Sequence, residues 1–265
     1  MPRANRYFLP EYIWHITHRC HKKEFLLKFS RDRKNWVRWL FEARKRFGLR
    51  VFNYSVTSNH IHLLAQTPEN NAEAIPESMQ LIAGRVAQDY NQRKGRKGAF
   101  WEDRYHATAV DRENHLLQCL VYIDLNMVRA GQVKHPKDWA ESGFQEIQGH
   151  KERYRTIDLK GLSNTLGFQD LDLFQKFYRE MIEHALSERE LGREEKWTKS
   201  IGVGGIDFLS CLVEALGVKV RNRKILPTSE SYVLRETFFP YESQIDAENT
   251  PIRPNNSHFW RLDRP

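Results

Sequence analysis

The stretch that decides the fold is Leu-Arg-Val-Phe-Asn-Tyr-Ser-Val-Thr-Ser-Asn-His-Ile-His-Leu-Leu-Ala-Gln, residues 49–66. Its first half, residues 49–57, is rich in β-branched and aromatic side chains and predicts a strand. Ser58 and Asn59 form a candidate two-residue turn, and residues 60–66 resume as a second strand. The whole segment therefore predicts a β-hairpin.

Elements on both sides of the hairpin complete an α+β core. Residues 12–19 alternate in the manner of a strand, and residues 106–110 predict a short fourth strand. Apolar side chains recur at helical spacing over residues 30–47, 75–92 and 113–128. The order strand, helix, strand, strand, helix, strand predicts a ferredoxin-like βαββαβ core, in which helices pack on one face of an antiparallel sheet. The last of the three helices lies beyond that core.

The sequence pattern of the chain changes near residue 150. Residues 1–148 hold the predicted core domain, and residues 149–166 are polar, contain turn residues and predict a linker. Residues 167–239 predict a small helical C-terminal domain, and residues 240–265, with several prolines and asparagines, predict an extended or disordered tail. Two helices are expected in the C-terminal domain, over residues 168–190 and 206–216.

Composition excludes several classes of protein. Of the 265 residues, 40% are hydrophobic and 29% are charged, which is ordinary for a globular protein and excludes a disordered one. No apolar run approaches the length of a membrane span, and the N-terminus does not resemble a signal peptide. Cys20, Cys119 and Cys211 lie far apart and form neither a disulfide framework nor a clustered zinc site. We therefore expect a protein of the reducing cytoplasm, without a membrane partner.

Positive charge is concentrated in the first part of the chain. Residues 1–150 contain 24 Lys and Arg against 16 Asp and Glu, whereas residues 151–265 contain 18 of each. Residues 1–50 alone contain 14 against 4. This asymmetry is typical of a module that binds a polyanion and is joined to a neutral one. A solvated basic helix face would produce the same count.

A pair of histidines stands on the second strand of the hairpin. His60 and His62 are two residues apart, so both imidazoles project from one face of the strand. Two imidazoles on a rigid strand can supply two ligands of a metal site. Such pairs also arise by chance in a chain with 11 histidines. His15, His18 and His21 are also close in sequence, but at spacings that a strand would not align.

Tyr122 and Asn126 stand one helical turn apart on the helix predicted over residues 113–128, so their side chains are neighbours. A lone tyrosine between apolar neighbours is most simply a half-buried core residue. A phenol beside an amide, both directed toward two imidazoles, would instead be a nucleophile next to a third metal ligand. Since a phenol has a pKa near 10, such a site must supply cationic activation.

A basic loop and an aromatic stretch follow one another in residues 93–98 and 98–105. Arginines beside aromatic rings can hold phosphates while the rings stack on unpaired bases. Alternatively, Phe100 and Trp101 cover the edge of the sheet. The candidate DNA-binding residues are Arg93, Lys94, Arg96, Lys97, Trp101 and Arg104.

Four motifs occur in an order that resembles one protein family. They are Tyr12-x-Trp-His-Ile-Thr-His-Arg19, Ser58-Asn-His-Ile-His-Leu-Leu64, Phe100-Trp-Glu-Asp-Arg-Tyr-His106 and Tyr122-Ile-Asp-Leu-Asn-Met-Val-Arg-Ala-Gly131. Together, over residues 5–145, they resemble the transposases that have a His-hydrophobe-His motif and one catalytic tyrosine. Within that family the chain most resembles the REP-associated tyrosine transposases.

The resemblance implies a ferredoxin-like core and a divalent metal, Mg²⁺ or Mn²⁺, held by His60 and His62. It implies that Tyr122 is the nucleophile and that Asn126 completes the site as a further metal ligand. The implied activity is metal-dependent cleavage and strand transfer of single-stranded DNA through a 5′-phosphotyrosine intermediate. The implied substrate is hairpin-forming repeat DNA, and we expect a monomer or a homodimer.

The chain departs from the family pattern at two positions. Met127 stands where members usually have proline, and Cys20 stands where they often have glycine. Neither position is catalytic, so the departures concern the subgroup and not the chemistry.

Two other functions fit part of the pattern. A sheet that binds single-stranded nucleic acid without catalysis explains the charge and the aromatic residues, but it leaves Tyr122, Asn126 and the histidine pair as coincidences. A metal-dependent hydrolase that uses water would retain its activity after Tyr122→Phe and would form no covalent adduct.

Overall fold

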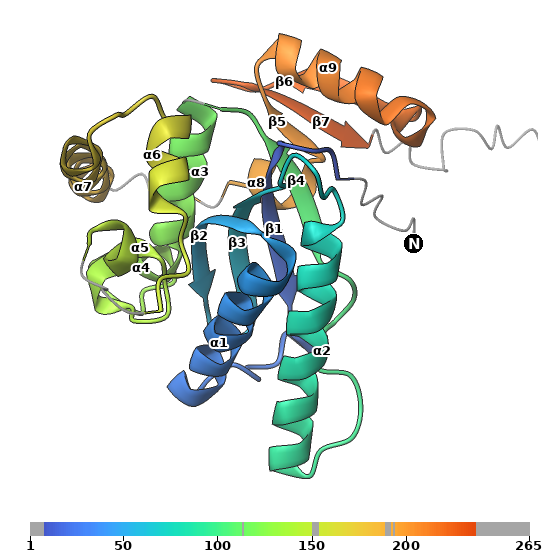
Figure 1. Cartoon of the computed structure of the whole chain (residues 1–265), viewed down its shortest axis with the longest axis vertical. Helices are drawn as coiled ribbons and strands as arrows, with labels where there is room; N and C mark the ends of the chain where they lie inside the picture. The colour runs from blue at the N-terminus through green and yellow to red at the C-terminus, as the bar shows by residue number, and fades with distance from the viewer. Residues whose placement is uncertain (1–7, 113, 150–153, 189–191, 193, 237–265) are drawn as a thin grey trace, which may run out of the picture.

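A seven-stranded sheet lies at the centre of the computed structural model, which describes residues 8–112, 114–149, 154–188, 192 and 194–236 (Figure 1). The strand order is β2-β3-β1-β4-β5-β7-β6. The strands are β1 (Ile13–Arg19), β2 (Arg50–Val56), β3 (His60–Gln66), β4 (His106–Val110), β5 (Gly202–Gly204), β6 (Arg223–Pro227) and β7 (Tyr232–Glu236).

The longer helices are α1 (Ser30–Phe47), α2 (Ala74–Lys94), α3 (Asn114–Asp124), α7 (Leu171–Ser187) and α9 (Ile206–Leu216). The short helices are α4 (Asn126–Arg129), α5 (Phe144–Ile147), α6 (Leu159–Thr165) and α8 (Lys196–Lys199), with 3-10 turns η1 (His21–Lys23), η2 (Pro136–Asp138) and η3 (Gly217–Val220).

The first four strands form the predicted core. β1 lies between β3 and β4, β2 pairs with β3, and all three pairings are antiparallel. The order β2-β3-β1-β4 is the one that a βαββαβ chain gives in a ferredoxin-like fold, so the predicted α+β class is confirmed. The hairpin has the predicted turn, and its register places Thr17 of β1 opposite His62 and Arg19 opposite His60.

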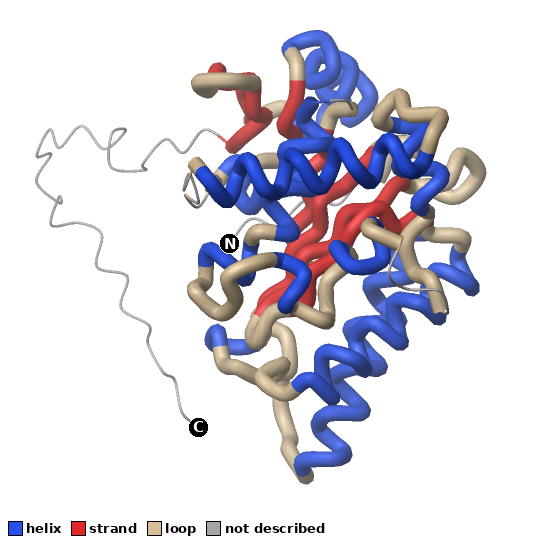
Figure 2. The backbone as a smooth tube through the Cα atoms, turned by 90° about the vertical axis from the view of Figure 1, so that its left-hand side faces the viewer, coloured by secondary structure: helices blue, strands red, loops and turns tan. Residues whose placement is uncertain are grey.

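The two faces of the core sheet are covered by different helices (Figure 2). α1 packs against α2 and β2, and Ile61 of β3 is fully buried on that face. α3 lies on the opposite face, where Asn53 of β2 donates a hydrogen bond to Asp124 over 3.0 Å. Some side chains of β1 and β3, including that of His62, point to this second face and therefore face α3.

Helix ends follow the sequence pattern closely. α1 has the predicted bounds, and it ends at Gly48, which has a φ of 69° that favours glycine. The helix predicted over residues 113–128 is interrupted at Leu125, so that Tyr122 is on α3 and Asn126 begins α4. The interruption is slight, because the amide of Leu125 still bonds to the carbonyl of Val121 over 3.0 Å.

The prediction of a purely helical C-terminal region is wrong. α7 and α9 are present as expected, but β5, β6 and β7 extend the core sheet beyond β4. β5 pairs in parallel with β4, with Ala109 opposite Gly202 and Val110 opposite Val203. The physical reason is that the edge of β4 supplies hydrogen-bond partners from almost a hundred residues away, which local periodicity does not show.

The segment predicted as a linker also has structure of its own. Residues 159–165 form α6, which begins after Asp158, whose side chain accepts a hydrogen bond from the amide of Gly161 over 3.0 Å. Asp158 also forms an ion pair with Arg50 of β2 over 2.9 Å, so this part of the chain is docked on the sheet. The tail predicted over residues 240–265 lies outside the described residues. The division of labour between domains on either side of residue 148 stays a prediction.

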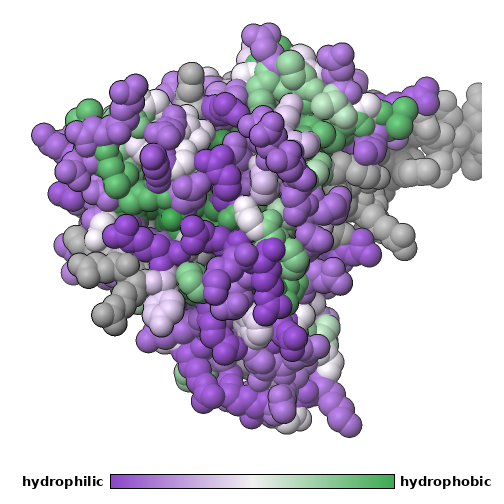
Figure 3. Space-filling view, in the orientation of Figure 1, coloured by the Kyte–Doolittle hydropathy of each residue, from purple (hydrophilic) through white to green (hydrophobic). Residues whose placement is uncertain are grey.

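The surface view in Figure 3 shows mainly hydrophilic side chains over the end of the molecule that α1 and α2 form. The last turn of α2 contributes Arg93 and Lys94 to this end. Among the described residues, no helix combines the length and the apolar character that a membrane span requires.

Candidate active site

A cleft of about 930 Å³ brings the predicted site residues together. It opens over the ends of β1 and β3, on the sheet face that α3 covers. Its walls include His60, His62, Tyr122 and Asn126, which sequence reasoning had grouped, and Arg104. Further lining residues are Thr17, His18, Arg19, Glu102, Asp103, His106, Arg129, Ala130, Thr198 and Lys199.

His60 is held by the turn of the hairpin. Its Nδ1 atom lies 2.9 Å from the Thr57 hydroxyl and 2.8 Å from Oδ1 of Asn59. The amide nitrogen of Asn59 donates to the carbonyl of Lys23 over 3.1 Å, which fixes Oδ1 as the atom that faces the imidazole. Because that oxygen only accepts, Nδ1 of His60 carries a proton and donates it to Asn59.

His62 lies deeper than His60 and is 2% exposed. The two rings are 5.0 Å apart between centroids. Burial, followed by the positive charge that His60 and His15 carry when protonated, lowers the pKa of His62 well below its usual value, so the ring is neutral. Its Nδ1 lies 2.9 Å from Nε2 of His15, and its Nε2 lies 3.0 Å from the side-chain amide of Asn126.

Tyr122 is packed among rings and beneath a cation. Its ring centroid lies 5.9 Å from that of His62, 6.1 Å from that of His15 and 6.1 Å from that of Trp197. The guanidinium carbon of Arg129 lies 4.1 Å from the centroid of the Tyr122 ring, and Nη2 of Arg129 donates to the backbone carbonyl of Tyr122 over 2.5 Å. The phenol, 4% exposed as a residue, thus has the cationic neighbour that a tyrosine nucleophile needs.

The donor set fits a divalent metal. The imidazoles of His60 and His62 both line the cleft, and the side-chain nitrogen of Asn126 lies 3.0 Å from Nε2 of His62, so Asn126 can present its oxygen there after rotation of the amide group. Imidazole and carbonyl oxygen are both ligands of first-row divalent ions. Among the described residues, no group of three or more His, Cys, Asp and Glu side chains could hold a metal. A metal at this site would therefore be held by two histidines and an amide.

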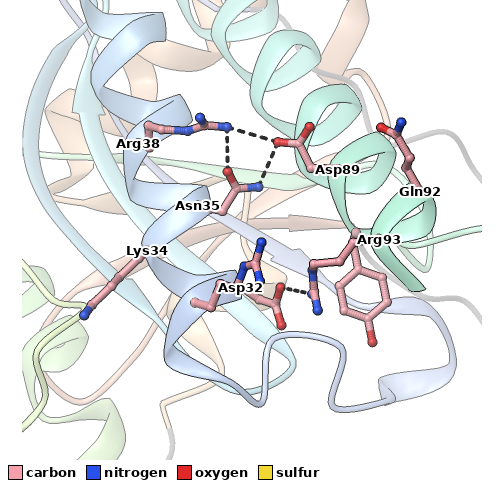
Figure 4. A pocket seen from close by; sticks show the side chains of 9 residues that line it. Asp32, Lys34, Asn35, Arg38, Asp89, Gln92 and Arg93 are labelled. Carbon is pink, nitrogen blue, oxygen red and sulfur yellow. Dashed lines mark hydrogen bonds and ion pairs between the residues drawn. The ribbon is translucent and has the colours of Figure 1, made fainter. Parts of the chain in front are cut away.

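The predicted DNA-binding residues are not all in one place. Arg104 lines the cleft, whereas Arg93 lies at the end of α2 in a second pocket, between α1 and α2 (Figure 4). There Arg93 forms an ion pair with Asp32. Lys94 ends α2, and Arg96 donates to the carbonyl of Ala99 over 2.9 Å. Lys97, in the loop that follows α2, is exposed.

Trp101 is engaged within the protein. Its ring stacks on His18 with centroids 4.1 Å apart, and its indole N–H donates to the carbonyl of Ala83 on α2 over 3.0 Å. It also forms an isolated β-bridge with Cys20 at the end of β1. These contacts correspond to the alternative interpretation, in which Trp101 covers the sheet edge. Its role in stacking on bases stays a prediction.

Three residues of the site were missed in the sequence. His15 had been set aside for its spacing from His18, although it is two residues from Thr17, which pairs with His62. Arg129 stands seven residues after Tyr122, two helical turns on, which was a usable signal. Trp197 lies far away in the chain, and no local pattern pointed to it.

Comparisons with known proteins found one family model and several solved structures that are similar to this chain. The family model described as "Transposase IS200 like" matches residues 9–126. A solved structure of a REP-associated tyrosine transposase bound to a REP hairpin is 18% identical, covers 60% of this chain and 93% of its own, and has a TM-score of 0.46. A crystal structure from Deinococcus radiodurans R1, of a protein provisionally described as a transposase, is 15% identical, covers 49% and 97%, and has a TM-score of 0.33. No curated protein matches the chain.

Proposed function

We propose that the protein cleaves single-stranded DNA and joins strands, with Tyr122 as the nucleophile, because residues 9–126 match the family model described as "Transposase IS200 like". The observation that supports this assignment most is the position of the phenol. Tyr122 lies in the same cleft as the two histidines and Asn126, with the guanidinium of Arg129 over its ring. A structural tyrosine would not need these neighbours.

The proposed reaction exchanges one phosphodiester for another. The phenolic oxygen of Tyr122 attacks the scissile phosphorus, loses its proton, and forms a bond to the 5′ phosphate. The bond from phosphorus to the 3′ oxygen breaks, and that oxygen takes up a proton and leaves as a free 3′-OH. A second 3′-OH can then attack the phosphotyrosine and release Tyr122, so the strands are rejoined without an external energy source.

A divalent cation, Mg²⁺ or Mn²⁺, held by His60, His62 and Asn126 would polarise the scissile phosphate and neutralise part of its charge. The three side chains leave the remaining coordination positions to the substrate. Since none of them is a carboxylate, the full charge of the ion remains available to the phosphate.

Arg129 is proposed to stabilise the negative charge that develops on the Tyr122 oxygen as its proton leaves. A guanidinium remains protonated throughout the accessible pH range and can act by charge alone. Its hydrogen bond to the carbonyl of Tyr122 also holds it over the ring in a defined position.

We propose that DNA enters the cleft beside Arg104 and Lys199, two cations that line it. Lys199 forms an ion pair with Glu195 over 2.6 Å, and both side chains are more than half exposed, so the pair is weak and can yield to a phosphate. Hairpin-forming repeat DNA is the proposed substrate, on the strength of the four motifs that resemble the REP-associated tyrosine transposases.

Covalent trapping separates this proposal from its two rivals. Purified protein is incubated with Mn²⁺ and an oligonucleotide labelled at its 3′ end, and the protein is then separated under denaturing conditions. We expect labelled protein, because the 3′ fragment remains attached through its 5′ phosphate. An oligonucleotide labelled at its 5′ end should instead release a shortened free strand.

Tyr122→Phe removes only the nucleophilic oxygen and should abolish both the adduct and cleavage while leaving DNA affinity unchanged. Tyr90→Phe, on the other face of the sheet, is the matched control and should behave as wild type. Cleavage by the Tyr122→Phe protein would favour a hydrolase that uses water. Binding without any cleavage by the wild type would favour a module without catalysis.

A further inference from the structure

A chain of buried hydrogen bonds runs from the C-terminal region into the candidate metal site. The backbone carbonyl of Trp197 lies 3.0 Å from Nδ1 of His15. Nε2 of His15 lies 2.9 Å from Nδ1 of His62, and Nε2 of His62 faces the amide of Asn126. His15 and Trp197 are both fully buried.

The direction of each hydrogen bond in this series follows from the backbone carbonyl of Trp197, with which the series begins. A carbonyl oxygen has no proton to donate, so the proton between Trp197 and His15 belongs to Nδ1 of His15. The ring of His15 is fully buried, and its partners are a carbonyl and an imidazole with no carboxylate beside them, so the ring is held neutral and its Nε2 has a lone pair. That lone pair requires a donor, which is Nδ1 of His62. The Nε2 atom of His62 is then left with its own lone pair toward the cleft.

The opposite arrangement would bring two lone pairs together. If His62 carried its proton on Nε2, its Nδ1 lone pair would face the Nε2 lone pair of His15 over 2.9 Å between two buried rings. A buried acceptor without a donor costs about 1–3 kcal/mol. The contact with His15 therefore selects one tautomer of His62.

We propose that His15, held by the backbone carbonyl of Trp197, is a positioning residue that fixes His62 as the Nδ1–H tautomer and presents its Nε2 lone pair to the metal site. This inference rests on the proposed function in one respect, that Nε2 of His62 is a metal ligand. The tautomer itself follows from the hydrogen bonds alone.

The same contact makes the C-terminal region part of the active site. Residues 196–200 lie outside the segment that matches the family model. They are anchored to β4, where the Thr108 hydroxyl donates to the carbonyl of Ser200 over 2.7 Å and His106 bonds to the same oxygen over 2.9 Å. The Trp197 carbonyl is thereby set at a fixed distance from β1, and Thr198 and Lys199 line the cleft beside it.

Nitrogen NMR of the imidazoles tests the proposal directly. Full-length protein with ¹⁵N in its histidine rings is studied without metal, where the shifts of the two nitrogens of a ring show which one carries the proton. We expect Nδ1–H for His62 in the wild type. His15→Phe keeps a ring but removes the acceptor, so His62 should shift toward the Nε2–H tautomer that is commoner in water.

His135→Phe is the matched control, because the ring of His135 bonds to Glu183 and to the amide of Lys137, away from the buried series of hydrogen bonds. It should leave the His62 tautomer as in wild type. An Nε2–H tautomer in the wild type would overturn the proposal, and so would an unchanged Nδ1–H tautomer in a folded His15→Phe protein. The wild-type measurement decides the matter even where a variant fails to fold.

Mn²⁺ affinity, measured by titration calorimetry without DNA, supplies a second readout. Loss of a residue that orients a metal-binding histidine typically weakens affinity by about 10- to 100-fold, which is the expected effect of His15→Phe. His15→Gln keeps an acceptor oxygen near Nδ1 of His62 and should recover part of the loss. A folded His15→Phe protein with wild-type affinity would contradict the positioning role.

The failure of this proposal is distinguishable from the failure of the proposed function. If His60→Ala and His62→Ala proteins bind Mn²⁺ as tightly as wild type, the metal site is wrong. The tautomer of His62 in metal-free protein still decides whether His15 orients it. Conversely, if the wild-type protein forms a covalent DNA adduct but its His62 is the Nε2–H tautomer, the proposed function stands and the positioning role of His15 is wrong.

Discussion

Replacing Arg129 with glutamine should slow DNA cleavage without weakening DNA binding to a similar degree. The guanidinium carbon lies 4.1 Å from the centre of the Tyr122 ring. Two unit charges at that distance interact by about 4 kcal/mol at an effective dielectric constant of about 20. The charge of a tyrosinate lies mainly on its oxygen and not at the ring centre, so a loss of roughly 2–4 kcal/mol is expected. This corresponds to a rate that is about 30- to 1,000-fold lower.

The assay is single-turnover cleavage of a labelled oligonucleotide at saturating protein, with affinity measured separately by fluorescence anisotropy. Arg129→Lys keeps a charge but loses the planar contact with the ring, and it should fall between glutamine and wild type. Melting temperatures show whether loss of the hydrogen bond to the Tyr122 carbonyl disturbs the fold. A folded Arg129→Gln protein that cleaves at the wild-type rate would refute the role assigned to this cation.

Three further outcomes are expected. His60→Ala and His62→Ala should each abolish DNA cleavage, and EDTA should abolish cleavage by the wild-type protein. Cleavage by the wild-type protein in the presence of EDTA would show that the assigned metal site is wrong. Tyr178→Phe removes the hydroxyl that donates over 2.6 Å to a buried carboxyl on α3, and it should lower the free energy of unfolding by about 1–3 kcal/mol in urea titrations. Arg104→Gln should reduce the slope of log affinity against log salt concentration by about 0.7, which is the value for one phosphate contact on a single strand. Arg93→Gln should change this slope less, because Arg93 is paired with an aspartate. Equal slopes for these two variants would place the DNA elsewhere.

The core of the fold was predictable because each of its elements has a local signal. The hairpin of residues 49–66 shows alternation on both sides of a turn, and α1 shows helical spacing that stops at Gly48. The same alternation placed His60 and His62 on one face. Helical spacing then placed Tyr122 one turn before Asn126, although the helix is interrupted between them.

The strands of the C-terminal region were not predictable in the same way. β5 has only three residues, Gly202, Val203 and Gly204, and its sequence has neither alternation nor an apolar run. It becomes a strand because the edge of β4 offers hydrogen bonds to it. A strand that exists only through a distant partner leaves no periodic pattern in its own sequence.

Because the net charge lies in residues 1–150, the sequence suggests that residues 151–265 could be removed without loss of DNA binding. The structure gives a physical reason against such a truncation. A protein that ended near residue 150 would leave the edge of β4 unpaired, and exposed edges of this kind invite aggregation. It would also lose Trp197, which is fully buried against Tyr122 and whose carbonyl holds His15. The unpaired edge of β4 and the absence of Trp197 would both disturb the candidate active site. Weak DNA binding by such a fragment would therefore not show where the DNA-binding surface lies. Single substitutions such as Arg104→Gln in the full-length chain locate that surface, because they leave the sheet and its C-terminal strands in place.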